Sequence, residues 1–200
     1  MQGKQQQPPE TSNDRDDDHA RPHRTDRQNL SHAAFTATID APIGKIDIAG
    51  WLRTLPDREY QRCAPPDHKA AGYTTTDDGR PMSINVEMIG TGLVVQHYAY
   101  ETAGKEHCHM VSISDVLTPS GWTTVQVIWD LKADPIDDKT SKYTNTVTTH
   151  PTAEFMDFIA RHGQTFEEAA TARQAASGDH CRRETPLFAA SIGRHANATK

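Results

Sequence analysis

Apolar and polar residues alternate along parts of the chain, which is the pattern of half-buried β-strands. In the segment AFTATI, the apolar positions are Phe35, Ala37 and Ile39. Further strands are predicted at residues 82–89, 93–100, 106–117, 121–132 and 141–150. The connections between these later strands are short, and short connections favour antiparallel pairing of consecutive strands. The pattern therefore predicts an antiparallel meander.

A helical spacing precedes the meander, in the segment DIAGWLRTLPDREYQRC. Ile48, Trp51 and Leu55 recur at the intervals of one helix face. Pro56 interrupts this helix, and a second short helix is predicted after it. The next stretch, residues 64–81, is rich in Pro, Gly and Asp, so we expect a loop there.

The last quarter of the chain is predicted to be helical. A first helix begins after Thr152. Thr165 and Glu168 then match the capping box S/T-x-x-E of a longer terminal helix. Pro186 lies inside that helix, so a kink or break is expected near it. The order of strand, short helices, meander and terminal helix predicts an α+β fold.

Residues 1–31 contain almost no large apolar side chain. Such a segment cannot bury enough apolar surface to offset its ordering entropy, so we predict a disordered N-terminal tail. Residues 32–200 then form one domain. The N-terminal segment also lacks the apolar core of a secretory signal.

Charge and composition exclude some functions. The 200-residue chain has a formal net charge of -6 and a pI of about 6.0, which gives nucleic-acid binding no electrostatic support. No apolar run approaches the roughly 20 residues of a membrane span. Cys63, Cys108 and Cys181 show no CxxC spacing, and an odd number of cysteines without a signal favours reduced thiols and a cytoplasmic location. A homodimer is compatible with these properties.

The hairpin formed by residues 82–100 carries several polar residues. With its turn centred on Thr91, Asn85 would face His97 and Glu87 would face Val95. Asn85, Glu87 and His97 would then share one face. Either the apolar opposite face packs into the core and these groups are solvated, or the polar face points into a ligand cavity.

Two further histidine patterns could bind metal or act in catalysis. His107 and His109 lie two residues apart on one strand face, a spacing that suits metal binding but is also common in solvated strands. His180 and Glu184 lie four residues apart in the terminal helix, on one face and about 6 Å from each other. They could form a surface ion pair, or give one nitrogen and one oxygen to a metal.

The order of elements, together with the opening IDAPIGKI, resembles the START-like or helix-grip superfamily, which includes polyketide cyclases. The resemblance covers roughly residues 33–197. It implies a curved antiparallel sheet that wraps around a long C-terminal helix and leaves a cavity between them. It also implies an apolar small-molecule ligand.

Within that superfamily, HCRRE at residues 180–184 is similar to a His-x-x-x-Glu pair in the diacetylphloroglucinol and phloretin hydrolases, which carry zinc. The resemblance implies a zinc site in which His97 and Glu87 complete the ligand set with His180 and Glu184. His107 and His109 are then candidates for a general acid or base.

The sequence leaves two functions open. One is an enzyme that acts on a small aromatic or polyketide-like molecule, as a metal-assisted carbon–carbon hydrolase or as a cyclase. The other is a non-catalytic carrier or sensor of a small hydrophobic ligand. A metal assay on His180→Ala and Glu184→Ala variants would separate them.

Overall fold

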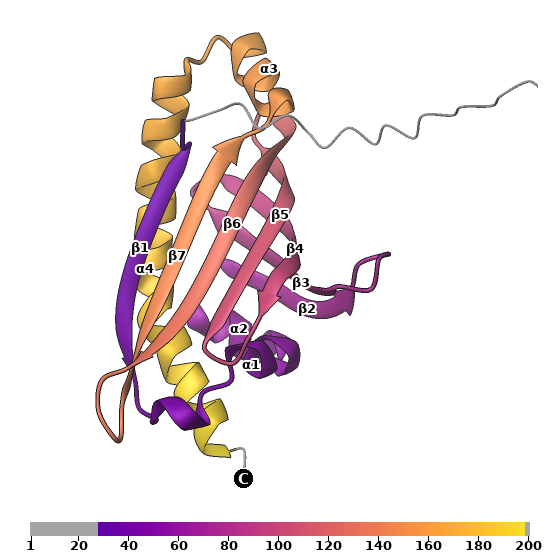
Figure 1. The fold of residues 1–200 in the computed structure, drawn as a ribbon. Coiled ribbons are helices and arrows are strands. Elements are labelled where there is room, and N and C mark those ends of the chain that lie inside the picture. Colours follow the sequence, from indigo (N-terminus) through magenta and orange to yellow (C-terminus); the bar gives the residue numbers. More distant parts are fainter. Residues whose placement is uncertain (1–27, 199–200) are drawn as a thin grey trace, which may run out of the picture.

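The computed structural model describes residues 28–198. Its centre is a seven-stranded sheet with the order β1-β7-β6-β5-β4-β3-β2, in which all neighbours are antiparallel. The strands are β1 (Ser31–Ile39), β2 (His68–Thr75), β3 (Pro81–Ile89), β4 (Gly92–Ala103), β5 (His107–Thr118), β6 (Gly121–Pro135) and β7 (Ser141–Pro151) (Figure 1). The predicted meander is therefore confirmed.

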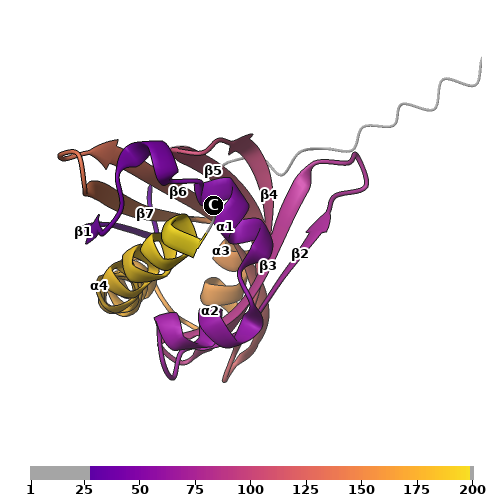
Figure 2. The same cartoon turned by 90° about the horizontal axis from the view of Figure 1, so that it is seen from below.

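Helices lie on the inner side of this curved sheet. They are α1 (Ile48–Thr54), α2 (Asp57–Cys63), α3 (Ala153–Arg161) and α4 (Phe166–Ala198), with a short 3-10 turn at Ile43–Lys45. Viewed from below, the sheet bends around α4, while α1 and α2 lie beside the C-terminal half of that helix (Figures 1 and 2). This arrangement is the helix-grip fold, and it confirms the predicted α+β class.

Helix α4 begins as predicted and does not break where a break was expected. Thr165 and Glu168 form the reciprocal capping box, with Glu168 Oε2 accepting from the Thr165 backbone N–H at 2.9 Å and Thr165 Oγ1 accepting from the Glu168 N–H at 3.2 Å. The helix continues through Pro186, which is exposed. Proline costs a helix interior about 3 kcal/mol. Full burial of Phe188 and Ile192 in the following turns outweighs this cost, because each contributes roughly 1.5–3 kcal/mol.

The register of the β3–β4 hairpin differs from the predicted one by one residue. Gly90 and Thr91 form a two-residue turn between the paired residues Ile89 and Gly92, and the positive φ of 62° at Gly90 suits such a turn. His97 therefore pairs with Ile84 rather than Asn85. Because a slip of one residue moves a side chain to the other face of the sheet, the prediction that His97 shares a face with Glu87 is wrong.

Two boundaries also differ from those predicted. Residues 64–81 do not form a single loop, because β2 occupies His68–Thr75 and pairs with β3. The predicted disordered tail lies mostly outside the described residues, which begin at residue 28. Leu30 and Ser31 are buried, so the ordered domain begins before residue 32.

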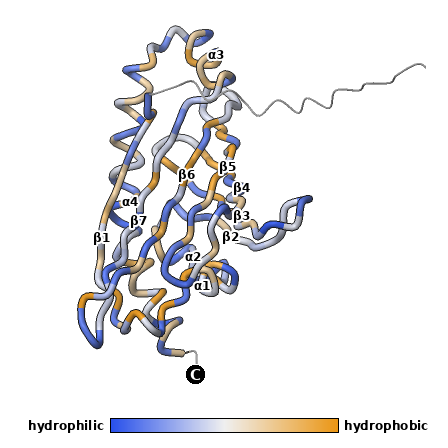
Figure 3. The backbone as a smooth tube through the Cα atoms, in the orientation of Figure 1, coloured by the Kyte–Doolittle hydropathy of each residue, from blue (hydrophilic) through white to orange (hydrophobic). Residues whose placement is uncertain are grey.

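The apolar core lies between the sheet and the helices. Its largest fully buried side chains include Trp51, Tyr60, Tyr143 and Phe188. Hydrophobic positions recur along β5 and β6, whereas the β2–β3 turn is hydrophilic (Figure 3). The three cysteines are buried free thiols. Several polar side chains are buried with this core, and they form the candidate site.

Candidate metal centre

Four ionisable side chains, His68, Glu87, His180 and Glu184, meet inside the domain and are called the inner cluster here. Nε2 of His68 lies 3.4 Å from Oε2 of Glu87 and 3.3 Å from Oε2 of Glu184. Nε2 of His180 lies at 3.4 Å and 3.3 Å from the same two oxygens. The four residues are between 3% and 7% exposed. Two nitrogens and two oxygens thus converge on one point in the protein interior.

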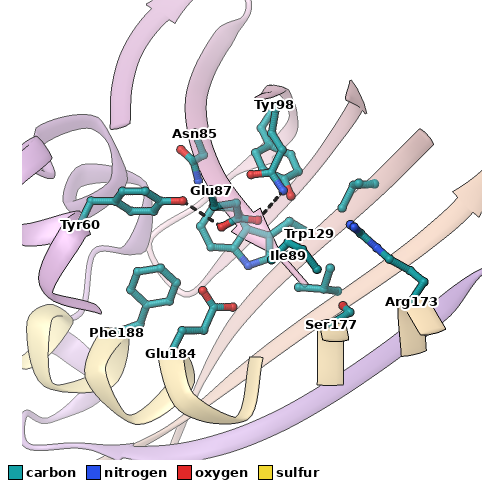
Figure 4. Close-up of a pocket in the computed structure, with 13 residues that line it drawn as sticks. Tyr60, Asn85, Glu87, Ile89, Tyr98, Trp129, Arg173, Ser177, Glu184 and Phe188 are labelled. Atoms are coloured by element: carbon teal, nitrogen blue, oxygen red, sulfur yellow. Dashed lines mark hydrogen bonds between the residues drawn. The ribbon is translucent and has the colours of Figure 1, made fainter. Parts of the chain in front are cut away.

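The fold brings these residues together from two regions that are distant in the sequence. His68 begins β2 and is paired directly with Glu87 on β3. His180 and Glu184 lie one turn apart on α4, on the face that points toward the sheet. Glu184 and Glu87 both project into the space between sheet and helix (Figure 4). The packing of α4 against the sheet therefore completes the cluster.

Each histidine of the inner cluster is oriented by a second hydrogen bond. Nδ1 of His68 lies 2.7 Å from the backbone oxygen of Tyr60, and Nδ1 of His180 lies 3.0 Å from Oδ2 of Asp67. Both partners only accept hydrogen bonds, so both Nδ1 atoms carry a proton. Nε2 of each ring therefore faces the cluster. Outer partners of this kind hold the histidines of metal sites in place.

The two carboxylates are held by donors in the same way. Glu87 accepts from the Tyr60 hydroxyl at Oε2, at 3.0 Å, and from the Gln96 amide at Oε1, at 2.8 Å. Glu184 accepts from the amide of Asn145 at Oε1, at 2.9 Å, which leaves Oε2 facing the two histidines. These donors fix the orientation of each carboxylate.

The two ionised carboxylates of the cluster need positive charge beside them. Burial alone would raise the pKa of Glu184, but the neighbouring His180 and His68 hold it well below its usual value. Burial would lower the pKa of His180, but the two glutamates raise it to about 11. Without a metal, a proton on His180 therefore balances part of the carboxylate charge. Even so, Nε2 of His68 and of His180 makes no hydrogen bond. Such orphaned buried nitrogens fit metal ligands.

The geometry and the donor set fit zinc. Four ligands in a regular tetrahedron, with bonds of about 2.0–2.1 Å, lie about 3.3–3.4 Å apart. The four nitrogen–oxygen separations in the inner cluster are 3.3 Å or 3.4 Å. All four ligand atoms lie within 4.8 Å of one another. An imidazole and carboxylate set of this size can hold one divalent ion.

Three of the four predicted metal ligands are in the inner cluster, and one is not. Glu87, His180 and Glu184 come together as predicted, whereas His97 is half-buried on the opposite face of β4. His68 takes the place predicted for His97. A weak signal for it exists in the sequence, since His68 precedes GYTTT, whose Tyr and Thr residues favour a strand.

The other predicted pair lies outside the cavity. His107 and His109 occupy the outer face of β5, where each bonds Oδ2 of Asp130 at 2.8 Å. Their side chains are 39% and 31% exposed, while Cys108 between them is buried. We call His107, His109 and Asp130 the outer cluster. The sheet separates it from the inner cluster, so these histidines cannot act as acid or base on a molecule bound at the inner cluster.

The inner cluster borders a small cavity. The volume of this inner cavity that the centre of a water molecule can occupy is about 20 Å³. Its lining residues include Tyr60, Glu87, Tyr98 and Glu184 (Figure 4). A single water needs roughly 10–15 Å³ by this measure, so the cavity has room for about one. A second, larger pocket of about 450 Å³ lies toward α3 and shares Ile89 and Arg173 with the inner cavity.

Comparisons with known proteins support the fold. A scan against models of known families finds no match, and neither does a search of curated proteins. Among solved structures, the Zhui aromatase/cyclase from Streptomyces sp. R1128 is similar, with a TM-score of 0.59 and 14% identity over 84% of this chain and 95% of that one. A conserved protein from Geobacillus kaustophilus is also matched, with a TM-score of 0.48 and 9% identity over 84% of this chain and 96% of that one. At 14% identity, the similarity to the Streptomyces protein establishes a shared fold only.

The fold that the resemblance implied, a curved antiparallel sheet around a long C-terminal helix, is thus confirmed. None of the helices in residues 28–198 has the length and apolar character that a membrane span requires.

Proposed function

We propose that this chain is a metal-dependent hydrolase or lyase that acts at a carbonyl group of a small, largely apolar molecule. The observation that carries the proposal is the convergence of two unbonded histidine nitrogens on two ionised, fully buried carboxylates. His68, Glu87, His180 and Glu184 would hold the ion. Zinc in such a site polarises a carbonyl oxygen and lowers the pKa of bound water.

The chain's own residues supply the remaining requirements of such a reaction. Glu87 and Glu184 both line the inner cavity, so the cluster opens on the space where a reacting group would lie. Tyr60 lines the same cavity and donates to Glu87. Burial, and then the charge of Glu87, raises the pKa of Tyr60 well above its usual value, so its hydroxyl keeps a proton there. Tyr98 and Trp129 shield the site from bulk water.

An aromatic or polyketide-like substrate agrees with the surroundings of the site. Tyr60, Phe188 and Trp129 provide aromatic faces beside the cluster. The structurally similar Streptomyces protein is described as an aromatase/cyclase. A metal ion held here would polarise the carbonyl oxygen of an aryl ketone substrate, and the aromatic side chains would bind its ring.

A carrier with a structural metal is the second candidate. One observation favours it: four protein ligands can complete a tetrahedral shell, as they do in structural zinc sites, whereas catalytic sites keep a position for water or substrate. The two candidates therefore differ in whether a bound ion accepts a further ligand.

Cobalt substitution tests both candidates. We expect about one equivalent of zinc per purified chain, lost in His180→Ala and in His68→Ala. After exchange for Co²⁺, adding acetophenone or acetohydroxamate should change the visible spectrum if the ion has an open position. An unchanged spectrum with stoichiometric metal would favour the carrier. A metal-free protein that stays metal-free after incubation with zinc would exclude the metal centre.

A further inference from the structure

The larger pocket beside α3, called the outer pocket here, has the size of a small-molecule site. It measures about 450 Å³ and lies between α3, the first turns of α4 and the β3–β4 and β5–β6 turns. Its wall is mostly apolar, with Leu30, Phe155, Phe158 and Ile159 among its lining residues. The inner cavity, in contrast, holds only about one water. An organic ligand would therefore place its bulk in the outer pocket.

Arg173 lies where the two spaces meet. It lines both the outer pocket and the inner cavity, on the same side of α4 as Ser177 and Glu184. Its side chain extends from the helix into the cavity, with the guanidinium directed inward (Figure 4). A ligand in the outer pocket that reached toward the inner cluster would pass this group.

The guanidinium of Arg173 lacks a partner. Its Nε–H is buried and donates no hydrogen bond, and within residues 28–198 the guanidinium forms no ion pair. The carboxylate that attracts it, Glu87, accepts hydrogen bonds from Tyr60 and Gln96 and faces the histidines. Arg173 is half-buried as a whole, but its Nε is shielded from water, and a guanidinium in that position without a direct partner is costly, so its retention points to a ligand.

The charges of the two spaces leave room for an anion. A divalent ion in the inner cluster would balance Glu87 and Glu184, which leaves the charge of Arg173 in excess. In the described part of the chain, no aspartate or glutamate lines the outer pocket. An arginine can bind a carboxylate through two parallel hydrogen bonds, which fixes the orientation of the bound molecule.

We propose that Arg173 is the anchor for a carboxylate or similar anionic group on an aromatic ligand whose apolar body fills the outer pocket. This inference deepens the proposed function, since it assigns the substrate class as an aromatic carbonyl compound that carries an acid group. The hydrogen bonds between Arg173 and the anion do not involve the metal. Its failure can therefore be told apart from failure of the metal centre.

Two fluorescent probes with the same aromatic body test the proposal. Anilinonaphthalene sulfonate is an anion, and N-phenylnaphthylamine is its neutral counterpart. Both are titrated into the full chain, with and without zinc, for the wild type and for Arg173→Met and Arg173→Lys. We expect Arg173→Met to weaken binding of the anion by about tenfold or more, because the charged hydrogen bond is lost. Arg173→Lys should weaken it less, because the charge is kept and only its position changes. The neutral probe should change less than about twofold.

Controls locate the probes and separate a structural role. Arg182→Met removes an exposed arginine that is paired with Asp179, and it should leave both probes unaffected. Ala172→Trp narrows the outer pocket and should weaken both. Equal losses of both probes in Arg173→Met, or an unchanged affinity for the anion, would overturn the proposal. Thermal unfolding of each variant confirms that it is folded.

Discussion

The inner and outer clusters both combine histidines with carboxylates and both use strands of the same sheet, but α4 supplies half of the inner cluster, and the two clusters have different properties. In the inner cluster each histidine has one nitrogen bound to an outer partner and the other left without a hydrogen bond. In the outer cluster, His107 and His109 both bond Oδ2 of Asp130 directly, at 2.8 Å, and remain partly exposed to water. The outer cluster is already satisfied by its own hydrogen bonds, whereas the inner cluster is not.

Both clusters bring histidines and carboxylates together, so burial and hydrogen bonding are what distinguish them. Burial makes every unmatched charge expensive, and the outer partners decide which nitrogen faces the centre. On the outer face of the sheet, solvent screens the same charges, and the same residue types form an ordinary surface network.

The largest difference between the clusters should appear on removing one histidine from each. His180→Ala leaves Glu87 and Glu184 buried without their counter-ion, which should lower the free energy of unfolding by about 3–5 kcal/mol. His107→Ala removes a partly exposed group, and a change within about 0.5 kcal/mol is expected. Urea denaturation of both variants measures this difference. Similar losses for the two would mean that burial does not distinguish the clusters.

The pH dependence of zinc binding should sharpen the contrast. The raised pKa of His180, about 11, means that its proton stabilises the metal-free fold below pH 6.5, and that this stabilisation is lost as pH rises toward 11. Zinc must displace this proton, so affinity should rise by about tenfold per pH unit. Competition with a chelator at pH 6, 7 and 8 measures the slope. Binding that does not depend on pH would contradict the protonated state of His180.

Outer partners of the two clusters offer a matched pair of substitutions. Asp67→Asn weakens the group that orients His180, and zinc affinity should fall by about 10–100-fold. Asp130→Asn makes the same chemical change in the outer cluster and should leave zinc affinity within about twofold. Competition with a chelator measures the zinc affinity of both variants. An equal loss would show that zinc also binds the outer cluster.

The smallest effect is expected for the stability of the outer cluster. Burial would raise the pKa of Asp130, but hydrogen bonds from His107 and His109 lower it. The ionised Asp130 therefore stabilises the fold above the usual aspartate pKa, and this stabilisation is lost as pH falls through the lowered pKa. Because the group is partly exposed, Asp130→Asn should cost less than about 1 kcal/mol at pH 7. Chemical denaturation at pH 7 checks this limit, and a loss of several kcal/mol would show a structural role.

Local patterns predicted most of the fold, because alternation and capping are short-range properties. The capping box at Thr165 and Glu168 formed as predicted, and His180 and Glu184 were placed together because helix geometry fixes residues four apart. Long-range packing decided the rest. Pro186 remained helical because the turns after it are buried against the sheet.

The missing ligand shows where sequence patterns were insufficient. His68 stands in a stretch whose prolines and glycines predict a loop, and only pairing with β3 made it a strand. His97 was misplaced because a hairpin with a two-residue turn and one with a three-residue turn differ by one residue in register. The alternation of polar and apolar residues in the β3–β4 hairpin does not by itself show which face points inward, because packing against α4 decides it.

The position of the inner cluster ties the last helix to the beginning of the domain. His68 and Glu87 belong to the sheet edge formed by β2 and β3, while the other two candidate ligands, His180 and Glu184, lie on α4. A bound ion would act as a reversible cross-link across most of the chain, in the way a disulfide restrains a large loop. Metal binding would then stabilise the docked position of the C-terminal helix, and removal of the metal would appear first as faster amide hydrogen exchange along that helix.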